Sequence, residues 1–303
     1  MFKKILIPLD GTLLSEQALE LAENLFATIE EDLEILLLQS TADATFYLGI
    51  PWGETPAVPE HRKTRIDKYI GKTAEATRTW AKNVKEITMI AKPEDAIIKI
   101  AVEEDVDLIV MFTHGYSTFE RLIVGSVTEK IVREAPCPVL ATRDGDVPKH
   151  MLIALDGTLF SEAILDPAFA LARLIKADVT LVLVDVDVDD LDMQKVVELS
   201  LTNRELAKTI LATHNTKSEH YLDGIYQRYV NKMDGIKIKV DYDIGYGEPS
   251  IQLPKLADQH ECDLIAMATH GNTGISRFWN GSVTHDVMHQ TKLAMLIIHP
   301  DSS

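Results

Sequence analysis

Apolar and polar positions change their spacing several times along the chain, and each change marks the border of an expected element. Short apolar runs such as 3–9 and 106–111 have the length of buried strands. Between such runs, apolar residues recur at the three- to four-residue spacing of an amphipathic helix, as at Leu14, Ala18 and Leu21. Strands that alternate with helices predict a parallel sheet with helices on both faces.

The whole pattern occurs twice. We expect strands at 3–9, 33–38, 84–91, 106–111 and 138–142, and again at 151–155, 179–186, 236–244, 263–268 and 294–299. We expect helices at 13–29, 60–80, after Pro93, at 125–133, up to 175, and at 192–229, 249–259 and 281–289. Residues 143–149, with Asp, Gly and Pro, form the expected linker. The sequence therefore predicts two tandem Rossmann-like α/β domains, 1–143 and 150–303, each with a five-stranded parallel sheet. The roles of the inserts 41–83 and 187–235 are left open.

Composition narrows the class of protein. The net charge of −17 repels phosphate backbones, and we see no basic patch, so no nucleic-acid partner is expected. No apolar run reaches the roughly 18 to 20 residues of a membrane span, and no signal-type cleavage site follows the start. The prediction is a cytoplasmic protein without a membrane partner. Cys137 and Cys262 lie in different halves without a C-x-x-C pair, which predicts two reduced, buried thiols.

A glycine-containing loop follows the fourth expected strand of each half. In the first half it runs from Thr-His-Gly115 to Gly125-Ser126, and in the second from Thr-His-Gly271 to Gly281-Ser282, with nine residues between the two glycines each time. The helix that starts there offers unpaired backbone N–H groups, the positive end of its dipole and a serine hydroxyl. This combination predicts an anion site in each half.

An aspartate follows the first expected strand of each half, Asp10 and Asp156. In an open parallel sheet, ligands bind beyond the carboxyl ends of the strands where the winding order reverses. If the first and fourth strands are neighbours there, each carboxylate faces its glycine loop and can accept hydrogen bonds from a ribose. The alternative is that each aspartate caps the next helix and the glycines only turn the chain. Both interpretations stay open from spacing alone.

The sequence gives less support to a phosphatase active site or to a metal site. Phosphatases with an aspartate nucleophile carry Asp-x-Asp-Gly-Thr, but Pro8 and Ala154 stand where the first aspartate would be. The acidic run 185–192 lacks the glycine and distal glutamate of a calcium loop. His114 and His270 lack a histidine or cysteine at ligand spacing, so loop-stabilising hydrogen bonds are expected of them. No metal site is predicted.

Taken together, these motifs resemble the universal stress protein family, and in particular its tandem members with two domains in one chain. The resemblance is carried by Ile-Pro-Leu-Asp10 and Ile-Ala-Leu-Asp156, by Thr-His-Gly with Gly-Ser-Val nine residues on, and by Ala-Pro-Cys-Pro-Val-Leu-Ala141. It implies binding of ATP or a related adenine nucleotide and a role in the stress response. The family's ATP-binding branch has Gly-x-x-Gly before the nine residues, whereas here Phe112 and Ala268 replace the first glycine.

The resemblance also implies which residues contact the nucleotide. In the second domain they are Ala154, Asp156, Val186, Ala268, Gly271, Gly281, Ser282 and Val283. In the first domain they are Asp10, Gly115, Gly125 and Ser126, with Pro8 and Ser40 at the adenine end. The second domain is the preferred site, because the phenyl ring of Phe112 is expected to take up nucleotide space and Ser40 replaces an apolar residue.

Family members pair through their last strands, so the resemblance implies that the two halves form such a pseudo-dimer within one chain, with a further homodimer as an open question. The leading hypothesis is a cytoplasmic tandem stress protein that binds an adenine nucleotide, mainly in its second domain. The alternative is a protein with degenerate sites that acts through protein partners. A weak ATPase with a phosphorylatable Ser282 is a third hypothesis, but the sequence offers it no evident base or metal set.

Overall fold

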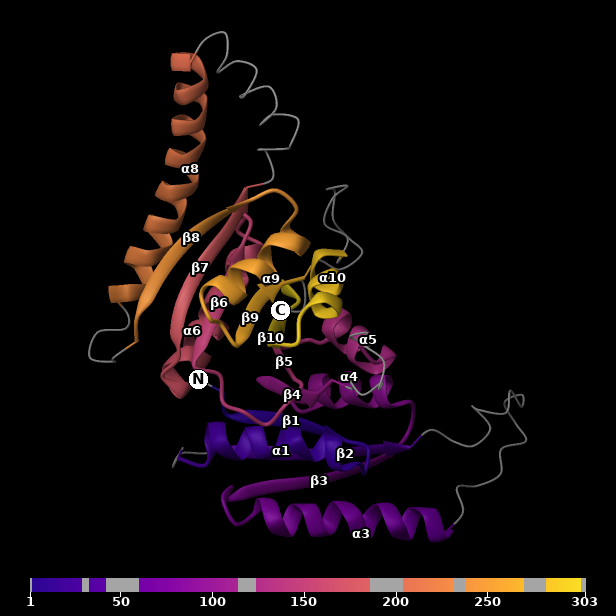
Figure 1. Cartoon of the computed structure of the whole chain (residues 1–303). Helices are drawn as coiled ribbons and strands as arrows, with labels where there is room; N and C mark the ends of the chain where they lie inside the picture. The colour runs from indigo at the N-terminus through magenta and orange to yellow at the C-terminus, as the bar shows by residue number, and fades with distance from the viewer. Residues whose placement is uncertain are drawn as a thin grey trace, which may run out of the picture. The chain divides into compact units, whose positions relative to one another are not determined.

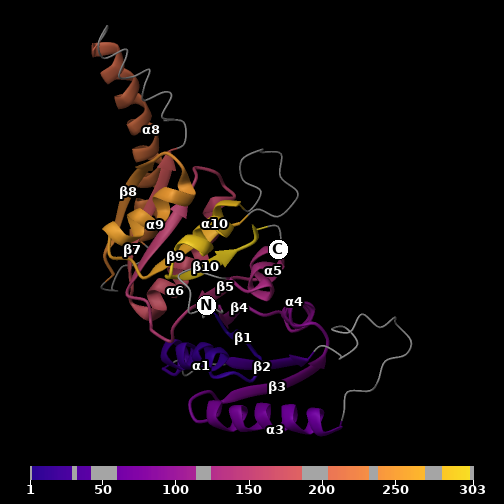
Figure 2. The same cartoon turned by 45° about the vertical axis from the view of Figure 1, so that its right-hand side comes forward.

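The chain forms two compact α/β units in the computed structural model (Figures 1 and 2). The structure describes residues 2–28, 33–41, 60–113, 124–185, 204–231, 238–269 and 282–300, without the side chains of 60–63, 204–216 and 282. The first unit takes in residues 1–147 and 297–303, and the second takes in 148–296. In the part of the chain so described, no helix combines the length and apolar character that a membrane crossing requires.

The first unit alternates strands and helices, as the sequence predicts. Its elements are β1 (Lys4–Leu9), α1 (Leu13–Phe26), β2 (Glu34–Thr41), α3 (Glu60–Thr77), β3 (Asn83–Ile90), α4 (Pro93–Glu103), β4 (Leu108–Phe112), α5 (Ser126–Glu134) and β5 (Val139–Thr142). The strand order is β3-β2-β1-β4-β5, with parallel pairing throughout. β1 thus pairs with β2 on one side and β4 on the other, so the first and fourth strands are neighbours, the condition under which Asp10 can face the glycine loop.

Helices cover both faces of this sheet, because right-handed crossovers in opposite directions place their helices on opposite faces. The connections β1–α1–β2 and β2–α3–β3 run toward one edge, so α1 and α3 share a face. The hydroxyl of Tyr69 on α3 donates to Oε1 of Glu16 on α1 at 2.9 Å. The chain then runs toward the other edge, which places α4 and α5 together on the second face, where they pack against each other. Apolar side chains of β1, β2 and β4 fill the core between these layers.

The second unit repeats this plan. Its elements are β6 (His150–Leu155), η1 (Ser161–Ile164), α6 (Leu165–Ile175), β7 (Asp178–Asp185), α8 (Arg204–Val230), β8 (Val240–Tyr246), α9 (Pro249–Gln259), β9 (Leu264–Ala268), α10 (Ser282–Gln290) and β10 (Ala294–Ile298). The order β10-β9-β6-β7-β8 matches that of the first unit. The predicted Rossmann-like fold of parallel sheets with helices is confirmed. The predicted pairing of the halves through their last strands stays a prediction.

The first helix of the second unit differs from expectation at its start. The helix predicted up to 175 begins as the 3-10 turn η1, because Pro167 has no N–H with which to bond the carbonyl four residues earlier. In the described part of the long insert, α8 agrees with the helix expected at 192–229, and its first half runs past the ends of β7 and β8 in both views (Figures 1 and 2). Its last turns are tied to the unit: Tyr229 stacks on Phe169 with ring centroids 4.4 Å apart and donates to Asp166 at 2.7 Å.

Candidate functional site

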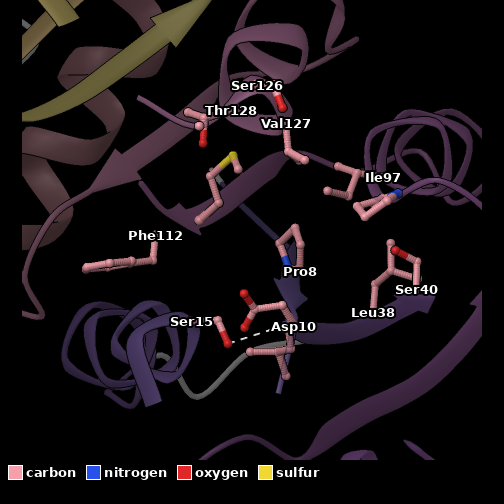
Figure 3. Close-up of a pocket in the computed structure, with 14 residues that line it drawn as sticks. Pro8, Asp10, Ser15, Leu38, Ser40, Ile97, Phe112, Ser126, Val127 and Thr128 are labelled. Atoms are coloured by element: carbon pink, nitrogen blue, oxygen red, sulfur yellow. Dashed lines mark hydrogen bonds between the residues drawn. The ribbon is translucent and has the colours of Figure 1, made fainter. Parts of the chain in front are cut away.

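A pocket of about 240 Å³ opens at the carboxyl ends of β1, β2 and β4 in the first unit (Figure 3). Its described lining is Pro8, Leu9, Asp10, Ser15, Leu38, Ser40, Pro93, Ile97, Met111, Phe112, Gly125, Ser126, Val127 and Thr128. The sequence-predicted residues Asp10, Gly125 and Ser126 therefore meet at one site. Gly115 and His114 lie outside the described residues. The pocket stands at the switch point of the sheet, where ligands bind in open α/β folds.

Asp10 is fixed by the turn that follows it. Oδ1 accepts from the backbone N–H of Thr12 at 2.9 Å and from its hydroxyl at 2.6 Å. Gly11 has φ +82, a left-handed conformation that glycine adopts without strain. The helix cap itself is Thr12, whose hydroxyl accepts from the N–H of Ser15 at 3.2 Å. Asp10 is therefore not the cap, and it lines the pocket while it holds the residue that caps α1.

The second unit builds the same turn with the same atoms. Asp156 Oδ1 accepts from the N–H and hydroxyl of Thr158 at 2.9 and 2.6 Å, and Ser161 N–H donates to the Thr158 hydroxyl at 3.2 Å. Gly157 has the same φ of +82. The repeated sequence Leu-Asp-Gly-Thr-Leu thus encodes a rigid loop that holds a carboxylate at the end of the first strand of each unit.

The start of α5 lines the first pocket through Gly125, Ser126, Val127 and Thr128. Gly125 is its N-cap and has no side chain with which to satisfy the first N–H groups. Those groups at residues 126–128 have no partner within the helix, because an α-helix leaves its first N–H groups unpaired. In Figure 3, Ser126 and Thr128 lie on the opposite side of the pocket from Asp10. A ligand between them can place hydroxyls at the carboxylate and an anionic group at the helix start.

Neither the backbone conformation of Gly125 nor the packing of the described residues excludes a side chain at this position. Gly125 has φ −72 and ψ 146, which any residue adopts. A Cβ added there would meet no described atom within 4 Å. The open space lies where the N–H groups of α5 begin. Glycine is also among the residues favoured at an N-cap, and the open space beside it leaves room for a ligand to approach the backbone closely.

The other end of the pocket is apolar. Pro8, Leu38 and Ile97 contribute apolar walls to the lining, and Ser40, beside Leu38 in Figure 3, adds a hydroxyl. Ile97 comes from α4, and its side chain is only 2% exposed. A flat, apolar ring system with a few polar edge atoms suits such walls.

Phe112 is one of the lining residues of the first pocket, and the expectation that its ring takes up nucleotide space stays a prediction. The side chain is 5% exposed, and in Figure 3 its ring extends away from Pro8 and Ser40. The residue after it, Thr113, ends the strand by donating its hydroxyl and its N–H to the carbonyl of Thr142, at 3.1 and 2.8 Å. The pocket beside Phe112 is the larger of the two candidate pockets.

The second pocket measures about 30 Å³, room for little more than water. Its described lining is Ala154, Leu155, Asp156, Phe160, Ser161, Val184, Pro249, Leu253, Met267, Ala268 and Val283. It therefore brings together Ala154, Asp156, Ala268 and Val283 of the prediction. The ring of Phe160 is part of its lining, whereas Leu14, at the matching place, does not line the first pocket. Val186, His270, Gly271 and Gly281 lie outside the described residues, as does the side chain of Ser282.

Strand register corrects the match between the halves at the second strand. Lys4 pairs with Glu34, and the corresponding His150 pairs with Asp178, so equivalent positions on β2 and β7 lie 144 residues apart. Ser40 therefore corresponds to Val184, a lining residue that the sequence analysis missed, whereas sequence spacing had matched it to Val186.

Further lining residues come from the helices after the third strands and were also missed. Pro93 and Ile97 begin α4, and Pro249 and Leu253 occupy the same places on α9. A proline at the first helical position, repeated with an apolar residue four positions later, was the available signal. The two pockets are thus built from equivalent positions of the repeat.

Comparison with known proteins agrees with the duplication of the domain. The model of the universal stress protein family matches residues 1–143 and again 148–299. A universal stress protein of Methanocaldococcus jannaschii is 30% identical over 144 residues, covering 47% of this chain and 83% of the relative. One of Thermus aquaticus is 33% identical over 144 residues, covering 47% of this chain and 100% of the relative.

Solved structures show the same fold over both halves. The crystal structure of a universal stress protein from Archaeoglobus fulgidus covers 97% of this chain and 97% of its own, with a TM-score of 0.64 at 15% identity. One from Pseudomonas aeruginosa covers 98% of this chain and 93% of its own, with a TM-score of 0.62 at 16% identity. The chain therefore belongs to the universal stress protein family, as a tandem member with two such domains.

Proposed function

We propose that this tandem universal stress protein binds ATP or a related adenine nucleotide in its first-domain pocket and acts in the stress response through the bound state. The observation that carries the proposal is the open space at Gly125, at the start of α5 and across the pocket from Asp10. Ribose hydroxyls would donate to Asp10, the base would lie against Leu38 and Ile97, and the phosphates would face the N–H groups of α5.

The size of the pocket agrees with this arrangement. Sites for small molecules begin at roughly 300 Å³, so the described cavity of about 240 Å³ would enclose only part of the ligand, the nucleoside. Phosphates would lie at its open side, beside the exposed Ser126. The first domain thus becomes the primary candidate on geometry, and the second remains the candidate that sequence motifs favour.

Cytoplasmic location is part of the proposal. Cys137 and Cys262 are free and buried, as predicted, and burial raises the pKa of both thiols to about 12. Such cysteines suit a reducing compartment, where thiols persist without forming disulfides.

Mass spectrometry of small molecules released from the denatured, freshly purified chain tests the proposal first. A thermal-shift titration with ATP then compares the wild type with Gly125→Val and Gly281→Val. If ATP at 100 times Kd stabilises the first domain, the shift corresponds to about 2.7 kcal/mol and is lost in Gly125→Val alone. Loss in Gly281→Val alone would instead place the site in the second domain.

The competing function is that of an interaction protein with degenerate sites. It is favoured by the small second pocket, with about 30 Å³ between described residues. The absence of both a co-purifying nucleotide and a thermal shift in the wild type would support this alternative and contradict the nucleotide proposal. Phosphate release above buffer from bound ATP would instead support the weak ATPase with a phosphorylatable Ser282.

A further inference from the structure

Helix α10 carries two histidines one turn apart, His285 and His289, away from the lining of the second pocket. Residues four positions apart lie on the same face of a helix, one above the other. We propose that these two imidazoles form a binding site for a divalent transition-metal ion, of which Zn²⁺ is the test case. The site is independent of the proposed nucleotide site.

The geometry of the pair is close to that of a chelate. The ring centroids are 4.4 Å apart with the ring planes tilted by 42°. A nitrogen of one ring lies within 4.8 Å of a nitrogen of the other. Two nitrogens bound at 2.0–2.1 Å to one tetrahedral zinc would be about 3.4 Å apart. Rotation of the rings about their side-chain bonds closes this difference without movement of the helix backbone.

A carboxylate orients the first imidazole. Nδ1 of His285 lies 3.3 Å from Oδ1 of Asp286. A neutral His285 that donates Nδ1–H to this carboxylate keeps its lone pair on Nε2, the atom then available to a metal. Metal-binding histidines commonly have such a carboxylate partner, which fixes the tautomer and makes the ligand more basic. The histidine and aspartate side chains are 55% and 49% exposed, so an ion can reach them from solvent.

The donor set selects the class of metal. Imidazole nitrogens suit Zn²⁺, Cu²⁺ and Ni²⁺, whereas Mg²⁺ and Ca²⁺ prefer oxygen ligands. Water can complete the coordination, which makes the ion exchangeable. A bound ion would join two turns of α10, a helix of nine residues that begins at Ser282. Metal binding is therefore expected to stabilise the second unit, because the unfolded chain does not hold the two rings together.

Isothermal titration of the tag-free, chelator-treated full chain with ZnCl₂ tests the proposal, with MgCl₂ as the comparison ion. The expected result is saturable binding of Zn²⁺ that weakens roughly a hundredfold in His285→Ala or His289→Ala, because the second imidazole of a chelate binds intramolecularly. His220→Ala on α8 is the matched control, an exposed helical histidine whose loss should leave Zn²⁺ binding unchanged. Asp286→Asn is expected to weaken binding about 10- to 100-fold with both ligands in place.

His289→Gln provides a second variant that preserves helix propensity and cannot supply an imidazole. Circular dichroism without metal should match the wild type, so that a loss of binding is not a loss of fold. Absence of saturable Zn²⁺ binding in the wild type overturns the proposal. Wild-type affinity and stoichiometry in the double variant His285→Ala/His289→Ala overturn it as well, since the ion then binds elsewhere on the chain.

Discussion

Replacing Gly125 by alanine tests whether glycine is needed at this position for ligand binding or for the stability of the fold. The residue has φ −72, and an added Cβ meets no described atom within 4 Å. Alanine restricts the unfolded chain, which stabilises a compatible position by about 0.4–1 kcal/mol. It is a poorer N-cap than glycine by a similar amount. The free energy of unfolding is therefore expected to change by less than about 1 kcal/mol.

Binding should respond much more strongly. Phosphate oxygens that accept hydrogen bonds from the N–H groups of α5 would lie about 2.7–3.2 Å from the nitrogens. The new methyl group would lie beside the space that these oxygens occupy. Losing one hydrogen bond to a charged group costs about 1.5–3 kcal/mol. The Kd for ATP should therefore rise roughly 10- to 150-fold, and further in Gly125→Val.

The assay is a competition titration against a fluorescent ATP analogue, carried out in the Gly281→Val background so that only the first domain reports. Urea unfolding of the same proteins gives the stability. Gly224→Ala, inside α8 and also without a described neighbour, is the control: it should stabilise by about 0.5–1 kcal/mol and leave Kd unchanged. Gly11→Ala is the comparison for a glycine that the fold requires, because Gly11 has φ +82. This replacement should lower the free energy of unfolding by about 1–2 kcal/mol.

Two outcomes would refute the reasoning. An unchanged Kd in both Gly125→Ala and Gly125→Val would mean that the nucleotide binds away from the start of α5. A loss of stability in Gly125→Ala as large as that in Gly11→Ala would mean that the fold requires this glycine, and the open space would then carry no information about a ligand.

Three further predictions concern stability. Thr12→Val removes the 2.6 Å bond to Asp10 and the N-cap of α1, so urea unfolding should show a loss of about 1–2 kcal/mol; an unchanged midpoint would contradict the role of the turn. Burial raises the pKa of the Cys137 thiol to about 12, so above pH 9 the unfolded chain releases a proton that the native chain keeps, and stability falls as the pH rises from 9 toward 12. Unfolding midpoints at successive pH values should fall less steeply in Cys137→Ala, and equal slopes would refute the assignment. Arg228→Ala breaks a 2.8 Å pair with Glu162, but the arginine is 48% exposed, so a loss above about 1 kcal/mol would be unexpected.

Local sequence determined most of the fold and part of the site. Apolar runs and helical spacing predicted the alternation of strands and helices in both halves, because burial of one face decides each element locally. The turn at Asp10 and Gly11 depends on residues within five positions of each other, so its repetition at Asp156 could be recognised from the sequence alone. Ser126 was predicted at the start of its helix because the beginning of a helix also depends on neighbouring residues in the sequence.

Only the tertiary structure decided how the loops combine into pockets. The match of Ser40 to Val184 follows from strand register, which depends on pairing across the sheet and not on spacing along the chain. The direction of the Phe112 ring depends on the packing around β4, so the size of the ring alone could not predict where it lies relative to the pocket. The approach of His285 to His289 is local to one helix, yet the structure had to show that their rings meet. Pocket volume cannot be predicted from local sequence, because it is the small space that remains between many packed side chains from distant parts of the chain.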